Sequence, residues 1–227
     1  IMKKIFISCM LLLSAAALSA QVELKTAAQA KLSAADVAVK IADRILAATT
    51  YEFKNTKTGE TYKSVKNLPL DMNVRVACKY NNWHYTNGVT HIALMELANK
   101  TGEKKYDDYV LKNMNFVFNE GNLDFFKKQY DKAMKDGGWY GVRKLSWHMI
   151  FRGKRLDDNG PMGASLIDLQ MKHPNKSFLN YINETADHLN YAEPRLEDGT
   201  IARIWPHVNT IWADDAFMLS LIHISEP

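Results

Sequence analysis

Two pairs of adjacent aspartates are the residues of this sequence whose type and spacing best suit chemistry. The stretch "RLDDNGPMGASL" contains Asp157 and Asp158, and the stretch "TIWADDAFM" contains Asp214 and Asp215. Each pair stands at the expected start of a helix, where adjacent side chains point about 100° apart, so that only one member of a pair can face a given site. Two carboxylates that face one pocket suit a sugar-processing enzyme, in which one moves a proton and the other orients water or a hydroxyl.

The same aspartates also have a purely structural interpretation. An aspartate at a helix start caps free backbone amides and interacts favourably with the helix dipole. For either pair taken alone, this is the more common role. The catalytic interpretation gains weight because both pairs begin the first helix of a hairpin, and such helix starts converge at one end of the inner wall of a closed ring.

A third stretch, "NNWHYTNGVTH", places Trp83, Tyr85 and Asn87 at the start of another expected helix. Aromatic faces pack against sugar rings, and an amide side chain hydrogen-bonds to hydroxyls. The alternative is an ordinary core tryptophan beside a turn asparagine. The sequence leaves both interpretations open.

Metal and cofactor chemistry find little support in the sequence. Its seven histidines are scattered, no His-x-x-x-His or Cys-x-x-Cys pair occurs, and Cys78 has no cysteine partner after residue 20. No Gly-x-Ser-x-Gly elbow, phosphate-binding loop or dinucleotide fingerprint is present. We therefore expect neither a metal nor a cofactor.

Helical hairpins are the elements that must position the carboxylates. In "GVTHIALMELANKTGEKKYDDYVLKNMNFVF", two helical patterns flank a Lys-Thr-Gly-Glu turn, and "MGASLIDLQMKHPNKSFLNYINETADHL" repeats the arrangement around a turn at 173–175. The apolar stripes are Tyr106, Tyr109, Val110, Met114 and Val117 in the first repeat, and Phe178, Tyr181, Ile182 and Leu189 in the second. "WADDAFMLSL" resembles the opening of a third hairpin. We expect an all-α array, either a solenoid or a closed ring, with no strand pattern long enough for a sheet.

Three other segments complete the expected domain. Ser33 is the predicted N-cap of an alanine-rich helix, and the polar residues 51–75 are expected to form a connection. Residues 119–155 are aromatic and basic, and include "DGGWYGVRKLSWHMIFRGKR". A long insertion of this kind either belongs to the binding face of the array or decorates its surface as a loop.

The N-terminus has the layout of a secretory signal peptide. Lys3 and Lys4 precede a short apolar run that ends in Ala-Leu-Ser-Ala, which predicts cleavage after residue 20 and an exported, periplasmic or secreted protein. Removal of those lysines leaves 27 of the 29 basic side chains against 25 acidic ones. This balance argues against nucleic acid as a partner, and no membrane association is expected after cleavage.

Four motifs in order resemble a known group of enzymes. "W-x-Y-x-N-G" at 83–88, "L-D-D-x-G-x-M-G" at 156–163, "D-G-T-x-x-R" at 198–203 and "W-A-D-D-x-F-M" at 212–218 are similar to those of the unsaturated glucuronyl and rhamnogalacturonyl hydrolases, glycoside hydrolase families 88 and 105. The resemblance implies an (α/α)6 toroid and an exo-acting enzyme whose partner is an unsaturated uronyl oligosaccharide, of the rhamnogalacturonyl type. Such enzymes hydrate the C4=C5 bond of a terminal unsaturated uronic acid instead of attacking the glycosidic bond directly.

The resemblance also implies roles for individual residues. Asp214 would be the general acid and base, and Asp158 the partner carboxylate that binds sugar hydroxyls. Each doublet permits a slip of one position, which keeps Asp157 and Asp215 as substrate-binding candidates.

Further contacts complete the implied site. Arg203 and His207 would contact the substrate carboxylate or hydroxyls, although Arg203 could equally pair with a surface acid. Trp212 would supply apolar surroundings that raise the pKa of Asp214. With Trp83, Tyr85 and Asn87, these residues form the expected substrate site.

A six-hairpin ring needs more chain than 227 residues, at roughly 50 to 75 residues per hairpin. We therefore expect residues 21–220 to form the N-terminal part of the toroid, and residues 221–227, in "LSLIHISEP", to be a non-native tail. An open ring exposes apolar faces, so we expect the chain as written to fold poorly and to be inactive. The sequence sets no expectation for the oligomeric state.

Two other functions fit the same residues. An ordinary inverting glycoside hydrolase on the same toroid would not need a double bond in its substrate. A non-enzymatic helical-repeat protein that binds glycans would use the aspartates only as caps, so asparagine substitutions would leave its function intact.

Overall fold

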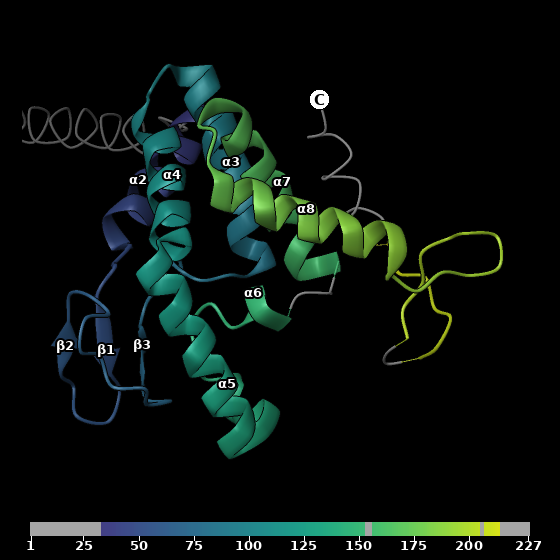
Figure 1. Ribbon diagram of the computed structural model, residues 1–227. Coiled ribbons are helices and arrows are strands. Elements are labelled where there is room, and N and C mark those ends of the chain that lie inside the picture. The colour runs from purple at the N-terminus through teal and green to yellow at the C-terminus, as the bar shows by residue number, and fades with distance from the viewer. Residues whose placement is uncertain (1–32, 153–155, 205–206, 214–227) are drawn as a thin grey trace, which may run out of the picture. The chain divides into compact units, whose positions relative to one another are not determined.

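The computed structural model describes residues 33–152, 156–204 and 207–213, apart from the side chains of Glu120 and Asp158 (Figure 1). The chain divides into two compact units, residues 1–43 and 44–227. The expected signal peptide and the expected tail at 221–227 both lie outside the described residues. No helix in the described part of the chain is long and apolar enough to span a membrane.

Helix α2 (Ala34–Ala48) begins in the first unit with a reciprocal cap. The amide of Asp36 donates to the Ser33 hydroxyl oxygen at 3.1 Å, and the Ser33 amide donates to the Asp36 carboxylate at 3.1 Å. Hydrogen bonds from the Ser33 hydroxyl and amide also lower the pKa of Asp36. The predicted N-cap at Ser33 is confirmed.

The second unit contains the end of α2 and then a small antiparallel sheet in the segment that the sequence predicted to be a connection. Strands β1 (Phe53–Asn55), β2 (Thr61–Tyr62) and β3 (Val74–Val76) pair in the order β2-β1-β3, with Phe53 opposite both Tyr62 and Val76. The prediction was wrong because strands of two or three residues are too short to show an alternating pattern. Phe53 and both valines of β3 are buried, so the sheet contributes directly to the core.

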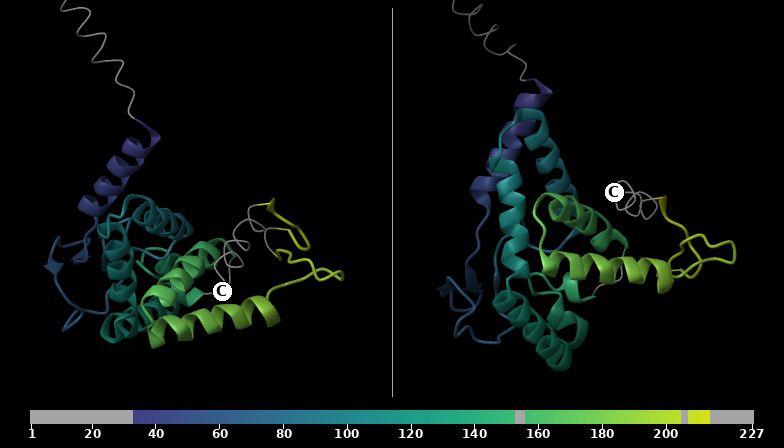
Figure 2. Two further views of the ribbon diagram at one scale, coloured as in Figure 1. Left: turned by 90° about the horizontal axis from the view of Figure 1, so that it is seen from above. Right: turned by 45° about the horizontal axis from the view of Figure 1, so that its top comes forward.

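Two helical hairpins follow, and they confirm the expected all-α architecture. The first consists of α3 (Tyr85–Thr101) and α4 (Lys105–Phe118), the second of α7 (Leu156–Lys172) and α8 (Lys176–Tyr191). Gly102 ends α3 in the left-handed conformation, and the Asn175 side chain caps α8 by accepting from the Ser177 amide at 2.8 Å. Both turns lie where the sequence placed them. Figure 2 shows the second hairpin in two further views, with α8 leading into the loop that follows it.

The described part of the segment 119–155 is largely helical, which contradicts its interpretation as a surface loop, while its place on a binding face stays a prediction. It contains α5 (Glu120–Val142) and the short α6 (Met149–Arg152). Gly138 breaks the helical geometry of α5 with φ 54° and ψ −150°, which only glycine adopts readily. Because glycine is typical of loops, its presence within the aromatic stretch makes this helix hard to recognise from the sequence.

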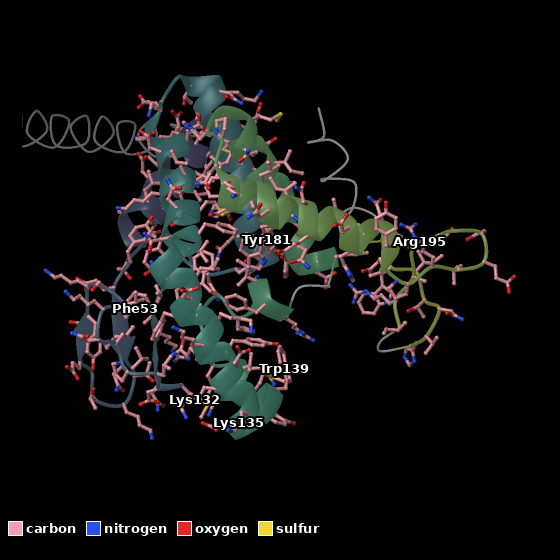
Figure 3. The ribbon with its side chains drawn as sticks, viewed as in Figure 1. Phe53, Lys132, Lys135, Trp139, Tyr181 and Arg195 are labelled. Atoms are coloured by element: carbon pink, nitrogen blue, oxygen red, sulfur yellow. The ribbon has the colours of Figure 1, made fainter. Side chains whose placement is uncertain are left out.

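An aromatic core joins these elements. The Phe53 ring lies 5.8 Å from Phe125 and 5.9 Å from Phe116, which ties β1 to α4 and α5. Trp147 packs 6.4 Å from both Phe116 and Trp83. Figure 3 labels Phe53, the first residue of β1, and Tyr181 on α8. Together these rings hold the sheet, the first hairpin and α5 in one packed unit.

Helices α3 and α7 approach each other closely at Gly88, which gives a first prediction. A Cβ atom at this position would lie 2.5 Å from the Met162 amide nitrogen and 2.5 Å from the Pro161 carbonyl carbon, both of them backbone atoms. We expect Gly88→Ala to lower the free energy of unfolding by about 3 kcal/mol, because backbone cannot move aside as a side chain can. Urea denaturation followed by circular dichroism measures the change.

The control for this prediction is Gly121→Ala, in the first turn of α5. A Cβ atom there would approach nothing closer than 3.5 Å, so the change should be neutral or slightly stabilising. Equal unfolding free energies for the two variants would show that α3 and α7 do not pack as described.

A buried histidine gives a second prediction, on the pH dependence of stability. His91 is only 2% exposed, and its Nε2 accepts a hydrogen bond from the Asn113 amide at 3.2 Å. Asn113 is oriented by the Tyr51 hydroxyl, which donates to its Oδ1 at 2.7 Å. The His91 Nδ1 has no partner within the described residues. Burial lowers the pKa of His91 to about 4, so the folded protein holds the ring neutral.

Because the folded pKa lies below the unfolded value of 6.5, the unfolded chain takes up a proton first as the pH falls. The stability contributed by neutral His91 is fully present above pH 6.5 and is lost between pH 6.5 and 4, by about 3 kcal/mol. Unfolding free energies measured at several pH values should show this loss. His91→Gln, which still accepts from Asn113 but does not titrate, should show a loss smaller by that amount, and an identical pH profile would contradict the assignment.

Candidate functional site

The first turn of α3 contacts the second turn of α7. Gly88 lies in the first turn of α3, and the backbone that it touches, at Pro161 and Met162, lies early in α7. Helix starts that the sequence assigned to separate hairpins are therefore neighbours. Backbone N–H groups are free at such starts, and the helix dipole favours negative charge there.

Asp157 stands in the first turn of α7 and forms an ion pair with Arg203. The Asp157 Oδ1 accepts a hydrogen bond from the Arg203 Nη2 at 2.6 Å. The two side chains are partly buried, 26% and 17% exposed respectively. Arg203 thus forms an ion pair with an acid, which was the alternative to a substrate contact. The pair is less exposed than an ion pair on the protein surface.

The same guanidinium reaches the segment that precedes the second aspartate pair. Its central carbon lies 4.1 Å from the centroid of the Trp212 ring, which is 39% exposed. The Arg203 amide donates to the Thr210 carbonyl at 2.8 Å, which fixes the backbone of the two segments against each other. The structure therefore brings together Asp157, Arg203 and Trp212, each from a different motif.

Of the aspartates expected to be catalytic, the structure describes only the backbone of Asp158. Asp158 lies in the first turn of α7, next to the ion pair, but its side chain is outside the described part. Asp214 and Asp215 lie outside the described residues. Trp212, two residues before Asp214, is the nearest expected site residue for which a contact is known.

Trp83 and Asn87 are core residues here, which corrects their expected contact with sugar. The Trp83 ring is fully buried and lies 4.9 Å from Tyr181 and 6.3 Å from Phe118. The Asn87 amide donates to the carbonyls of Lys79 and Asn82 at 2.9 and 2.8 Å. Their motif shapes the turn before α3 and the packing of its first turn.

Tyr181 extends this support to the start of α7. Its hydroxyl donates to the side-chain oxygen of Asn159 at 3.0 Å. Asn159 is itself buried, and it lies in the same helical turn as Asp157. The start of α7 is thus held by α8 as well as by α3.

Tyr85 and His207 are exposed, as a contact with substrate requires. Tyr85 is 38% exposed, and its ring packs 4.6 Å from the ring of His84. His207 accepts a hydrogen bond at its backbone oxygen from the Thr210 hydroxyl at 2.8 Å, in the loop that carries Arg203. Both residues remain substrate-binding candidates.

The structure adds a group of residues that the sequence had marked only as an aromatic and basic segment. Trp139, His148 and Arg152 contact one another, with the Arg152 guanidinium carbon 4.0 Å from the Trp139 centroid and the two rings 5.8 Å apart. Burial is the main cause that lowers the pKa of His148. Composition indicated the segment, but only the kink at Gly138 and the α6 turn bring these side chains together.

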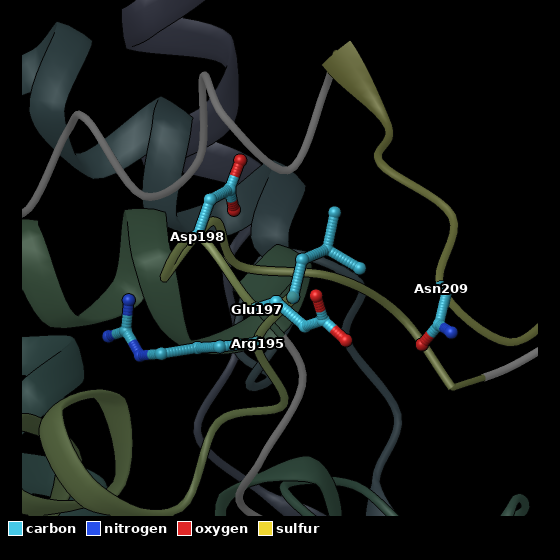
Figure 4. Close-up of a pocket in the computed structure, with 5 residues that line it drawn as sticks. Arg195, Glu197, Asp198 and Asn209 are labelled. Atoms are coloured by element: carbon cyan, nitrogen blue, oxygen red, sulfur yellow. The ribbon is translucent and has the colours of Figure 1, made fainter.

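The loop after α8 borders an open hollow of about 510 Å³ (Figure 4). Arg195, Leu196, Glu197, Asp198 and Asn209 line it. The Arg195 guanidinium is engaged by the carbonyls of Gly199 and Leu189 at 2.9 and 2.8 Å, so it shapes the loop. Among the described residues, no group of three or more His, Cys, Asp or Glu side chains could hold a metal ion.

The described site is a helical-hairpin array in which an ion-paired aspartate at a helix start lies in one chain of contacts with a tryptophan, an arrangement that suits an α-helical enzyme acting on sugars. A comparison with known protein families identifies the class more narrowly. The sequence model of Glycosyl Hydrolase Family 88 matches residues 55–225 of the chain. This range covers most of the chain, so the protein belongs to that family, whose members are glycoside hydrolases that act on unsaturated uronides. None of the curated proteins compared with the sequence matches it.

Proposed function

We propose that this protein removes a 4,5-unsaturated uronic acid from the non-reducing end of oligosaccharides released by a polysaccharide lyase, with unsaturated rhamnogalacturonides as the preferred substrates. The observation that supports this most directly is the chain of contacts from Asp157 through Arg203 to Trp212. It ties the loop that leads to Asp214 to the helix start that carries Asp158. On this support we assign the chemistry to one aspartate from each of the two motifs.

The chemistry assigned to these carboxylates is hydration of the enol ether. The Asp214 carboxylic acid gives its proton to C4, and water adds through its oxygen to C5. The water's second proton returns to the Asp214 carboxylate, which restores the acid. The hemiketal formed at C5 opens its ring to a ketone, and the aldehyde then forms at C1 as the C1–O bond to the remaining sugar breaks.

Asp158 is assigned the partner role, and the ion pair supports this choice over Asp157. The Asp157 carboxylate is engaged by Arg203, so its charge is already balanced. Adjacent residues in a helix project in different directions, which leaves Asp158 to orient the sugar hydroxyls. Arg203 then acts by placing Trp212 and the following residues, in place of the substrate contact expected from sequence.

Export is part of the proposal. A leader that ends at residue 20 would place the enzyme in the periplasm or outside the cell, where lyase products arise. The N-terminal sequence of the protein purified from a secreting host tests this, since the proposal requires it to begin at Gln21.

The test of the activity uses the ultraviolet absorbance of the double bond. The protein is incubated with an unsaturated rhamnogalacturonan disaccharide, and in parallel with an unsaturated glucuronyl disaccharide and a saturated rhamnogalacturonan disaccharide. We would assay the chain alone and the chain joined to the C-terminal hairpins of a family member, because the expected ring needs six. Loss of absorbance, faster with the rhamnogalacturonyl substrate, supports the proposal. Sugar release from the saturated compound without loss of absorbance would indicate an ordinary hydrolase.

A further inference from the structure

We propose that His188 and Glu193 act as a positioning pair for the reaction, because the hydrogen bond between them fixes the loop that carries Arg203 and Trp212. Neither side chain of the pair touches the substrate in this proposal. The effect of the pair on the rate rests on the proposed function, whereas its effect on the position of the loop does not.

The pair lies where α8 passes into the loop that follows it. His188 is in the last turn of α8, and its Nε2 lies 2.7 Å from a carboxylate oxygen of Glu193. A carboxylate only accepts hydrogen bonds, so the Nε2 hydrogen of His188 is the donor. The two side chains are 16% and 9% exposed, so water competes little for this bond. The His188 carbonyl also accepts from the Glu193 amide at 2.9 Å, which attaches the same residue a second time.

Backbone pairing transmits this attachment along the loop to Arg203. The carbonyl of Pro194 accepts a hydrogen bond from the Ala202 amide at 2.9 Å, and Arg195 pairs with Ile201 in an antiparallel bridge. Ala202 is buried and directly precedes Arg203. The place at which the pair holds the first strand of the loop therefore sets the place of the guanidinium.

Apolar packing brings the pair against the start of α7. Leu189, which follows His188, and Leu156, which precedes Asp157, are both buried in one cluster, and Ile201 packs against them. The end of α8, the loop and the start of α7 therefore meet at this point. A displacement of the loop along α8 would stretch the ion pair that Asp157 forms.

A second attachment of the loop limits the expected effect. The Arg195 guanidinium donates to the Leu189 carbonyl of α8 at 2.8 Å and to the Gly199 carbonyl at 2.9 Å. Loss of the histidine hydrogen bond leaves this attachment in place, so the loop should shift and not detach. A displacement of about 1 Å is enough to lower the rate of an enzyme by up to about 100-fold.

Two substitutions of His188 separate the hydrogen bond from the bulk of the ring. His188→Gln keeps an N–H donor that can reach Glu193, whereas His188→Leu fills similar space without a donor. We would assay the chain joined to the C-terminal hairpins of a family member, with the unsaturated rhamnogalacturonan disaccharide. His188→Leu should lower kcat about tenfold and change KM by less than about twofold, because a shifted loop misplaces the acid and not the substrate. His188→Gln should keep more than about half of kcat.

A control variant and a double variant test the path through Arg203. Glu197→Gln removes a carboxylate from an exposed side chain of the same loop (Figure 4), and should change kcat by less than about twofold. In the Arg203→Gln background, His188→Leu should cause little further loss, because the residue through which it acts is already removed. Thermal unfolding of each variant establishes that it is folded.

Limited proteolysis of the 227-residue chain measures the position of the loop without any activity. The Arg203 side chain is largely buried in its ion pair, so trypsin should cut the bond after it slowly. His188→Leu should speed this cleavage by about fivefold or more, and His188→Gln should not. Cleavage after Lys57, in the exposed turn between β1 and β2, is the internal reference and should not change.

Four results would overturn the inference. These are an unchanged kcat in His188→Leu, equal losses in His188→Leu and His188→Gln, a full further loss in the Arg203→Gln background, and an unchanged rate of cleavage after Arg203. Absence of absorbance loss in every variant would count against the proposed function instead. The cleavage rates would then decide the inference alone.

Discussion

Replacement of Asp214 by asparagine is expected to slow removal of the unsaturated sugar by about 10²–10⁴-fold and to leave the protein folded. Protonation of C4 requires an acid, and an amide cannot supply the proton. Asparagine caps a helix start as well as aspartate does, so the substitution separates chemistry from stability. Initial rates of absorbance loss measure the first effect, and thermal unfolding followed by circular dichroism measures the second.

The matched control for Asp214 is its neighbour. Asp215→Asn removes the same charge from the adjacent position, where a helical side chain points about 100° away, and should change the rate by less than tenfold. If Asp215→Asn produced the larger loss of rate, the general acid would be Asp215 and not Asp214. If neither variant lost activity, the aspartates would be caps, as in a glycan-binding protein.

The hairpins were predictable because their apolar spacing extends over whole helices. The stripe from Tyr106 to Val117 is buried as expected, and Phe178 is fully buried at the equivalent place in the second hairpin. The turn at Gly102 carried its own signal, since its left-handed conformation favours glycine. Local periodicity of this kind is present in the sequence itself.

The sheet and α5 were missed because their signals are short or interrupted. Strand β2 has two residues, too few for any alternation, and its place in the sheet depends on pairing with β1. Helix α5 carries Gly137 and Gly138 beside aromatic residues, a composition that is typical of a loop. Burial of Phe125 and Phe126 against Phe53 gives the helix its stability.

The role of Trp83 could not be decided from sequence for a different reason. A tryptophan that stacks on sugar and one that fills a core have the same local pattern. What decides between them is whether distant residues cover the ring, and here Phe118, Trp147 and Tyr181 do so. The pairing of Asp157 with Arg203, 46 positions apart, is equally invisible to local reasoning.

This ion pair predicts that the two aspartates at the start of α7 respond differently to substitution. Asp158→Asn should reduce the rate by about 10²-fold or more with little change in stability, because an amide binds sugar hydroxyls without the negative charge of the partner carboxylate. Asp157→Asn should lower the free energy of unfolding by about 1–2 kcal/mol, because it leaves the partly buried Arg203 guanidinium without its 2.6 Å carboxylate partner. Rates and urea denaturation curves of both variants measure the contrast.

The Arg203→Gln and Asp157→Asn/Arg203→Gln variants test why Asp157 matters. If the pair acts by holding Trp212, the double variant should be no less stable than either single one, because removing both charges leaves none unpaired. All three variants should also bind substrate with similar affinity, since Arg203 then makes no contact with the substrate carboxylate. A much weaker substrate affinity in Arg203→Gln than in Asp157→Asn would instead indicate that Arg203 contacts the substrate. The choice of Asp158 over Asp157 as the partner carboxylate would then lose its structural basis.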